Sequence, residues 1–175
     1  ETEDRVPKLA NKLRLGKEQD IWMIVSGAGR VSGASLAILE QLKDRKVNVI
    51  HISADPLLIS KTQHRQQKVV FNVLQQYARS GMFEAIWLFC NSQIQNFAGE
   101  GSIDNYYENI NNAIVNFLSN YGYFANTKPF MGSHHEPNEI SRIRTVSIGD
   151  DENNLENLYF LLDNITETCY YYSVS

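Results

Sequence analysis

The segment DIWMIVSGAGRVSGASLAILEQL, from Asp20 to Leu42, decides the fold that we expect for this chain. A short apolar run, Ile21 to Val25, precedes three glycines, and leucines then recur at helical spacing. An apolar run without polar alternation is typical of a strand that is covered on both faces of a parallel sheet. A strand, a glycine-rich turn and a helix in this order present backbone N–H groups to a phosphate. The segment therefore predicts a phosphate-binding turn between a buried strand and a helix.

Strands and helices are expected to alternate along the first two thirds of the chain. Helical patterns cover residues 3–17, 35–42, 64–79 and 106–117, and short apolar runs at 47–52 and 85–90 predict two more strands. This alternation indicates parallel βαβ units with right-handed crossovers. The predicted fold class is α/β, with a parallel Rossmann-like sheet of at least three strands and helices on both faces.

The chain changes character after Tyr121. Residues 125–139 are rich in turn-forming residues and are predicted to be a linker. Residues 1–124 then form a first domain. Residues 140–175 form the start of a smaller α+β second domain, with a strand pattern at 142–149, a helical pattern at 150–165 and a strand pattern at 168–175.

The bulk composition excludes several classes of protein. The chain has 175 residues, of which 43% are hydrophobic, and this suits one domain or one domain and part of another. Its net charge is −4 and no Lys/Arg cluster stands out in the sequence, so no nucleic-acid partner is expected. Two cysteines are too few for a disulfide framework, and no apolar run reaches about 18 residues, so no membrane span is expected. We expect a cytoplasmic protein.

The glycine turn is open to three interpretations. A Walker A loop is excluded, because no Lys-Ser/Thr follows the last glycine. The turn resembles that of NAD(P)-dependent short-chain dehydrogenases, with Asp55 at the ribose end of the next strand, but the Tyr-x-x-x-Lys pair of that family is absent. Tyr123 and Lys128 are five residues apart and do not share a helical face. A second interpretation is a Rossmann-like interaction domain in which the turn binds no ligand.

A longer resemblance connects the chain with the tubulin/FtsZ superfamily. Residues 27–35, GAGRVSGAS, are similar to the signature loop G-G-G-T-G-T-G-A-A of that family. Residues 50–65 resemble its strand and proline loop, 85–91 its strand ending in Asn, and 102–118 the helix beside the nucleotide base. The resemblance implies that residues 1–124 are the nucleotide-binding domain, whose first glycine-rich half would precede Glu1.

The resemblance also implies a site and a function. GTP or GDP, accompanied by Mg²⁺, is the implied cofactor, and self-association or a larger protein assembly is the implied role. The turn would hold the phosphates, and the helix after residue 102 would lie near the base. The implied nucleotide-binding residues are Gly27, Ala28, Gly29, Arg30, Ser32, Gly33, Arg65, Asn91, Tyr106 and Asn111.

Several departures from the family pattern bear on activity. Val31 replaces a glycine, and its Cβ restricts the backbone where a phosphate would approach. Arg30 replaces a small hydroxyl residue and is able either to pair with a phosphate or to fill its place. Asn138 and Glu139 are the nearest remnants of the acidic residues that activate water across the subunit interface in the family. A weak GTPase and a pseudo-GTPase fit this pattern equally, no catalytic residue is assigned, and no metal site made by the protein alone is predicted.

Overall fold

The computed structural model describes Leu9 and residues 19–29, 32–92, 94, 105–127 and 142–146; the side chains of Tyr106 and Tyr107 are outside this description. The chain divides into two compact units. The first comprises residues 1–92 and 142–146, and the second comprises residues 93–141 and 147–175. Each unit is described by itself.

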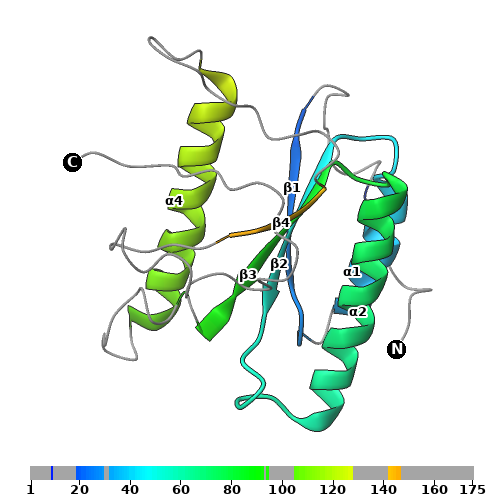
Figure 1. Cartoon of the computed structure of the whole chain (residues 1–175), viewed down its shortest axis with the longest axis vertical. Helices are drawn as coiled ribbons and strands as arrows, with labels where there is room; N and C mark the ends of the chain where they lie inside the picture. Colours follow the sequence, from blue (N-terminus) through cyan, green and yellow to red (C-terminus); the bar gives the residue numbers. More distant parts are fainter. Residues whose placement is uncertain are drawn as a thin grey trace. The chain divides into compact units, whose positions relative to one another are not determined.

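The described elements confirm the predicted α/β class. They run in the order β1 (Ile21–Ser26), α1 (Ser32–Gln41), β2 (Val47–Ser53), α2 (Lys61–Ser80), β3 (Ala85–Cys90), α4 (Tyr106–Asn126) and β4 (Ile143–Thr145) (Figure 1). The four strands form one parallel sheet in the order β1-β2-β3-β4.

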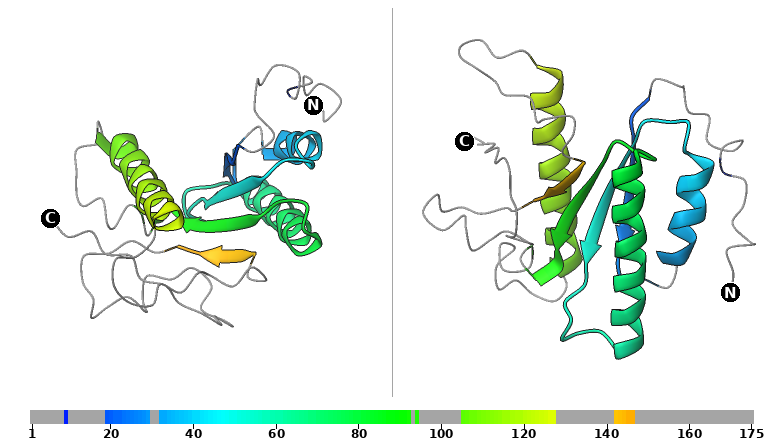
Figure 2. Two further views of the ribbon diagram at one scale, coloured as in Figure 1. Left: turned by 90° about the horizontal axis from the view of Figure 1, so that it is seen from above. Right: turned by 45° about the vertical axis from the view of Figure 1, so that its right-hand side comes forward.

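The two helices of the first unit lie on the same face of this sheet. Successive strands are neighbours, so both crossovers step in the same direction, and crossovers of one hand then place their helices on one face. In agreement, α1 and α2 contact each other and lie side by side (Figure 2). The helix α4 belongs to the second unit, so a helical layer on the other face stays a prediction.

The strand β1 differs from the sequence prediction, which expected cover on both faces. The side chain of Ile24 is 53% exposed, whereas Ile50 in β2 and Ile86 in β3 are fully buried. The reason is the strand order, because β1 is at an end of the described sheet and has a hydrogen-bonded neighbour on one side only. An apolar sequence therefore does not distinguish an edge strand from a central one.

The helix α2 begins three residues before the predicted start, and its ends show why. Ser60 and Gln63 form a capping box, with the Gln63 N–H donating to Ser60 Oγ at 3.3 Å and the Ser60 N–H donating to Gln63 Oε1 at 3.0 Å. At the other end Gly81 adopts a left-handed conformation, with φ 76°. The buried face of the helix includes Val70 and Leu74.

The strand β4 extends the sheet rather than opening a separate unit. It pairs in parallel with β3, and the Ile86 N–H donates to the Arg142 carbonyl at 2.7 Å. Residues 142–146 thus belong to the first compact unit, although the sequence analysis placed them in the second domain. The remaining domain boundaries stay predictions.

Three further predictions can be compared with the described residues only in part. The helix α4 continues to Asn126, so the first residues of the predicted linker are helical. The helix predicted at 3–17 lies outside the described residues except for Leu9, and the elements predicted at 150–165 and 168–175 lie outside them completely. No helix in the described part of the chain is long and apolar enough to cross a membrane.

Candidate functional site

The candidate site lies at the carboxyl edge of the sheet, because parallel strands end at the same edge. The turn from Gly27 to Gly29 follows β1, the loop at 54–60 follows β2, and Asn91 follows β3. Ligands of parallel α/β sheets bind outside this edge. In the first unit, the loop between β2 and α2 extends beyond the strand ends at the bottom of Figure 1.

The backbone of the glycine turn makes hydrogen bonds within the protein. The Gly27 N–H donates to the Ile52 carbonyl at 2.9 Å, and the Gly29 N–H donates to the Ser26 carbonyl at 3.3 Å. The Ser32 hydroxyl lies 2.6 Å from the carbonyl oxygens of both Ser26 and Gly29, and it is buried. These donors are directed to the turn itself or, for Gly27, to strand β2, so they are not free for a phosphate.

A neighbouring side chain leaves no space for a Cβ at position 27. A Cβ at this position would lie 2.8 Å from Gln67 Cγ and 2.9 Å from Gln67 Oε1. Gln67 is not free to move, because its Nε2 donates to Ser53 Oγ at 2.9 Å and its Oε1 accepts from the Ala54 N–H at 3.0 Å. The first glycine of the motif therefore serves the packing of α2 against the strand ends.

A second glutamine joins α2 to the turn. Gln66 Nε2 donates to the Gly29 carbonyl at 3.3 Å. The sequence analysis missed both glutamines. The signal for Gln67 was its position three residues before Val70 and seven before Leu74, on the buried stripe of the helix, where a polar side chain requires a hydrogen-bond partner.

The other two glycines of the motif are not required by close contacts. A Cβ at Gly29 would make ordinary van der Waals contacts, and a Cβ at Gly33 would meet no atom of the described residues within 4 Å. Among the described glycines only Gly81 has a left-handed backbone. No described side chain therefore crowds Gly33, which lies in the first turn of α1, where backbone N–H groups have no partners within the helix. Arg30 and Val31 lie outside the described residues.

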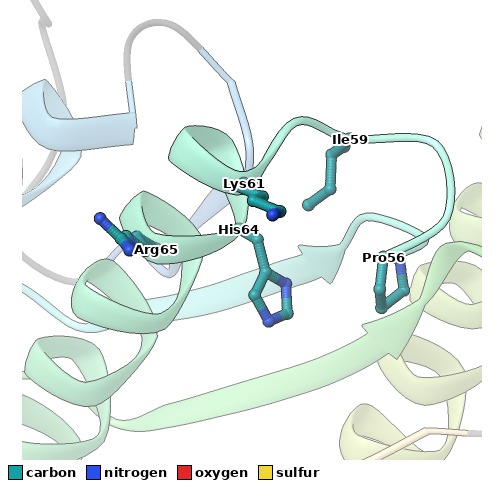
Figure 3. A pocket seen from close by; sticks show the side chains of 5 residues that line it. All are labelled: Pro56, Ile59, Lys61, His64 and Arg65. Carbon is teal, nitrogen blue, oxygen red and sulfur yellow. The ribbon is translucent and has the colours of Figure 1, made fainter.

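The loop after β2 is an ordered turn that forms one side of an open pocket. The Leu57 N–H donates to Asp55 Oδ1 at 2.8 Å, and the Leu58 N–H donates to the Asp55 carbonyl at 3.1 Å. Asp55, the proposed ribose contact of a dehydrogenase, thus stabilises its own turn. The pocket has a volume of about 290 Å³ and is lined by Pro56, Ile59, Lys61, His64 and Arg65 (Figure 3).

The polar lining of the pocket is basic. Lys61 and Arg65 are exposed, and neither has an ion pair among the described residues. His64 is half-buried, and its Nδ1 is buried without a hydrogen-bond partner within the described structure. Figure 3 shows the His64 ring between Pro56 and the first turns of α2. The arrangement suits an anionic group better than a cation.

The structure does not place Tyr106 and Asn111, the two residues implied for the nucleotide base, at this site, whereas Asn91 lies at the carboxyl edge. Asn91 is half-buried directly after β3. Tyr106 begins α4, but its side chain is outside the description, and Asn111 is exposed on the same helix. Because α4 belongs to the second compact unit, the positions of Tyr106 and Asn111 relative to the glycine turn stay predictions.

A buried histidine lies below the site in β2. His51 is 1% exposed, neither ring nitrogen has a hydrogen-bond partner among the described residues, and its ring centroid lies 5.2 Å from that of Phe71. Burial lowers the pKa of His51 from 6.5 to about 4, while a weaker interaction with its own backbone acts in the opposite direction. His51 is therefore neutral at pH 7 and is closed off from solvent.

The described residues hold no group of three or more His, Cys, Asp or Glu side chains that would bind a metal ion. No family model, curated protein or solved structure matches the chain in the comparisons. The geometry of the carboxyl edge is thus the basis for a functional proposal, together with the sequence resemblance.

Proposed function

We propose that this chain is a divergent tubulin/FtsZ-like assembly component whose carboxyl edge binds a phosphate-bearing ligand, with GTP or GDP as the first candidates. The proposal rests on one observation. The hydrogen bond from Gln66 to the Gly29 carbonyl places the glycine turn beside the first turns of α2, where Lys61 and Arg65 have no carboxylate partner in the described structure. An anion beside the glycine turn would meet the N-terminus of α1, while Lys61 and Arg65 add positive charge to the first turns of α2.

The same geometry favours binding over hydrolysis. The Ser32 hydroxyl is turned toward the carbonyls of Ser26 and Gly29, and the Gly27 N–H is used by the sheet. These groups are therefore not directed at a reacting phosphate. A pseudo-GTPase that works through assembly requires only that the ligand bind and that copies of the chain associate.

Ligand-dependent stability tests the proposal directly. The melting temperature is measured with GTP, GDP and NADPH in turn. A ligand present at 100 times its dissociation constant adds about 2.7 kcal/mol to the free energy of unfolding. We expect a rise with GTP or GDP, and a loss of that rise in Gly29→Val, whose side chain extends into the turn beside Ser26 and Ser32.

The controls separate the alternatives. Gly122→Ala adds a methyl group in open space on α4 and should keep the response to nucleotide. A response to NADPH alone would support the dehydrogenase interpretation and contradict the proposal. Light scattering with and without GTP then tests assembly, which we expect to depend on nucleotide. A chain that responds to no ligand and stays monomeric would leave only the interaction-domain interpretation.

A further inference from the structure

The helix α2 has an unusual charge for this chain. Its 20 residues include four cationic side chains and no carboxylate, whereas the whole chain has a net charge of −4. The sequence analysis found no basic cluster, because these residues are separated along the chain. The helix brings three of them together, since Lys61, Arg65 and Lys68 are spaced by four and three residues and so lie on one face.

This basic face is open to solvent. Lys61, Arg65 and Lys68 are all exposed, and none has an ion pair among the residues that the structure describes. Val69 lies on the same face and is also exposed. The opposite side of the helix is occupied by buried residues that pack on the sheet, Val70 and Leu74 among them in the first unit. The cations therefore have no structural role within the described sheet and helices.

Two exposed leucines lie in the loop that directly precedes this helix. Leu57 is 92% exposed and Leu58 is 71% exposed, the two largest exposed fractions among the described large hydrophobic side chains. The turn that carries them is held by Asp55, which accepts the N–H of Leu57 on its side chain and that of Leu58 on its carbonyl. The leucines are thus presented by an ordered turn.

We infer that the surface formed by Leu57, Leu58, Lys61, Arg65 and Lys68 binds the face of a membrane that contains anionic lipid. We call it the leucine–lysine surface. The two leucines would enter the boundary between headgroups and acyl chains, and the cations would lie at the level of the lipid phosphates. The pocket beside Pro56 and Ile59 is wide enough for part of a headgroup. This inference does not depend on nucleotide binding.

The chemistry of the surface favours lipid over a protein partner. A leucine that is 92% exposed protrudes, so a protein would need a complementary socket, whereas an acyl layer accepts a protruding side chain without one. Leucine is also under-represented among residues that dominate protein–protein binding energy, where Trp, Tyr and Arg are enriched. Positive charge beside a protruding apolar pair matches the charge and the layering of an anionic bilayer surface.

Vesicle binding by the full chain tests the inference. We expect co-sedimentation with vesicles that contain phosphatidylglycerol and little with phosphatidylcholine vesicles, with binding that weakens as salt is raised. Leu57→Ser with Leu58→Ser should weaken binding at least about tenfold, because each leucine loses its transfer into the apolar layer. Lys61→Gln, Arg65→Gln and Lys68→Gln together should weaken it at least as much and remove most of the salt dependence.

A matched control lies on the same helix. Arg79→Gln removes one exposed cation at the far end of α2 and should leave vesicle binding unchanged. Because all the substituted side chains are exposed, urea unfolding should give a similar stability for every variant. Absence of binding to phosphatidylglycerol vesicles would overturn the inference. Binding that needs the cations but not the leucines, or that a duplex RNA or an acidic protein matches in strength, would indicate a general polyanion surface and would also overturn it.

Discussion

At the scale of single residues, His51 is the buried polar side chain whose surroundings the sequence does not predict. It lies in an otherwise apolar strand, is 1% exposed, and packs against Phe71 with both ring nitrogens unpartnered among the described residues. A buried polar group without a partner destabilises a fold by about 1–3 kcal/mol. The strand pattern predicts that this position is buried, and only the tertiary structure shows that no described residue forms a hydrogen bond with the ring.

His51 should make stability depend on pH. Its pKa is about 4 in the folded state and 6.5 in the unfolded chain, so the unfolded state takes up the proton first as the pH falls. The stability is then full above about pH 6.5, decreases between pH 6.5 and 4, and changes no further below the folded pKa, for a total of about 3 kcal/mol. Urea unfolding across this range measures the effect.

Substitution of His51 provides the comparison. His51→Leu should raise the free energy of unfolding at pH 7 by about 1–3 kcal/mol and flatten its dependence on pH between 6.5 and 4. An unchanged slope in His51→Leu would assign the pH dependence to other groups.

Gly27 and Gln67 form a second residue-scale test. Gly27→Ala should destabilise the fold by about 1–3 kcal/mol, because the new methyl group meets Gln67 at 2.8 Å and displaces a side chain held by two hydrogen bonds. In the Gln67→Ala background the same change should cost much less. Urea unfolding of the two single variants and the double variant measures the coupling, and additive effects would contradict a direct contact.

At the scale of elements, α1 shows which glycine of the motif is available to a ligand. Gly33 lies in the first turn of the helix, its Cβ position is open, and its backbone is not left-handed. A glycine in such a place has no structural requirement in the described chain. The glycine at position 33 therefore either has no specific role or allows a ligand to approach the backbone.

Gly33→Ala distinguishes these two cases. The substitution should raise the free energy of unfolding by up to about 1 kcal/mol, since alanine is the better helix former. Gly122→Ala on α4 is the matched control, with the same methyl group in equally open space. Isothermal titration with GTP should show weaker binding to Gly33→Ala alone; equal affinity in both variants would mean that the first turn of α1 does not touch the ligand.

At the scale of the whole molecule, the order of the strands shapes the candidate site. The described sheet runs β1-β2-β3-β4 without a reversal, so it lacks the switch point at which many α/β sheets bind nucleotides. The site therefore has to be formed by the turn after β1 and the loop after β2. Two glutamines of α2 connect these segments, because Gln66 forms a hydrogen bond with the turn and Gln67 forms one with the end of β2. This order also leaves β1 at an end of the sheet, with Ile24 exposed.

Much of the local structure followed from the sequence. The strands β1, β2 and β3 agree with the apolar runs within one residue, β4 covers only the start of the strand pattern at 142–149, and the long helix α2 was expected from its apolar stripe. Such patterns are reliable because burial of one face forces a period on the side chains. The start of α2 was missed, because its first turns are polar and the capping box of Ser60 and Gln63 makes them helical.

The candidate site was predicted less well than the fold. The sequence located the glycine turn, and its resemblance to the tubulin/FtsZ loop assigned every glycine to a phosphate. The structure adds that Gln67 approaches Gly27 closely and that no described atom lies within 4 Å of a Cβ at Gly33, while the phosphate roles of the glycines stay predictions. The spacing of glycines along a chain does not show which side chain approaches each of them, since that neighbour comes from another helix.

The sequence by itself thus determined most of the described strands and helices and the parallel α/β class of this protein. Those properties follow from local periodicity and from the direction of the strands. Only the tertiary structure decided the strand order, the close approach of Gln67 to Gly27 and the burial of His51 without a hydrogen-bond partner among the described residues. The physical reason is that these properties depend on how a helix and a sheet pack, and packing joins residues that the sequence keeps apart.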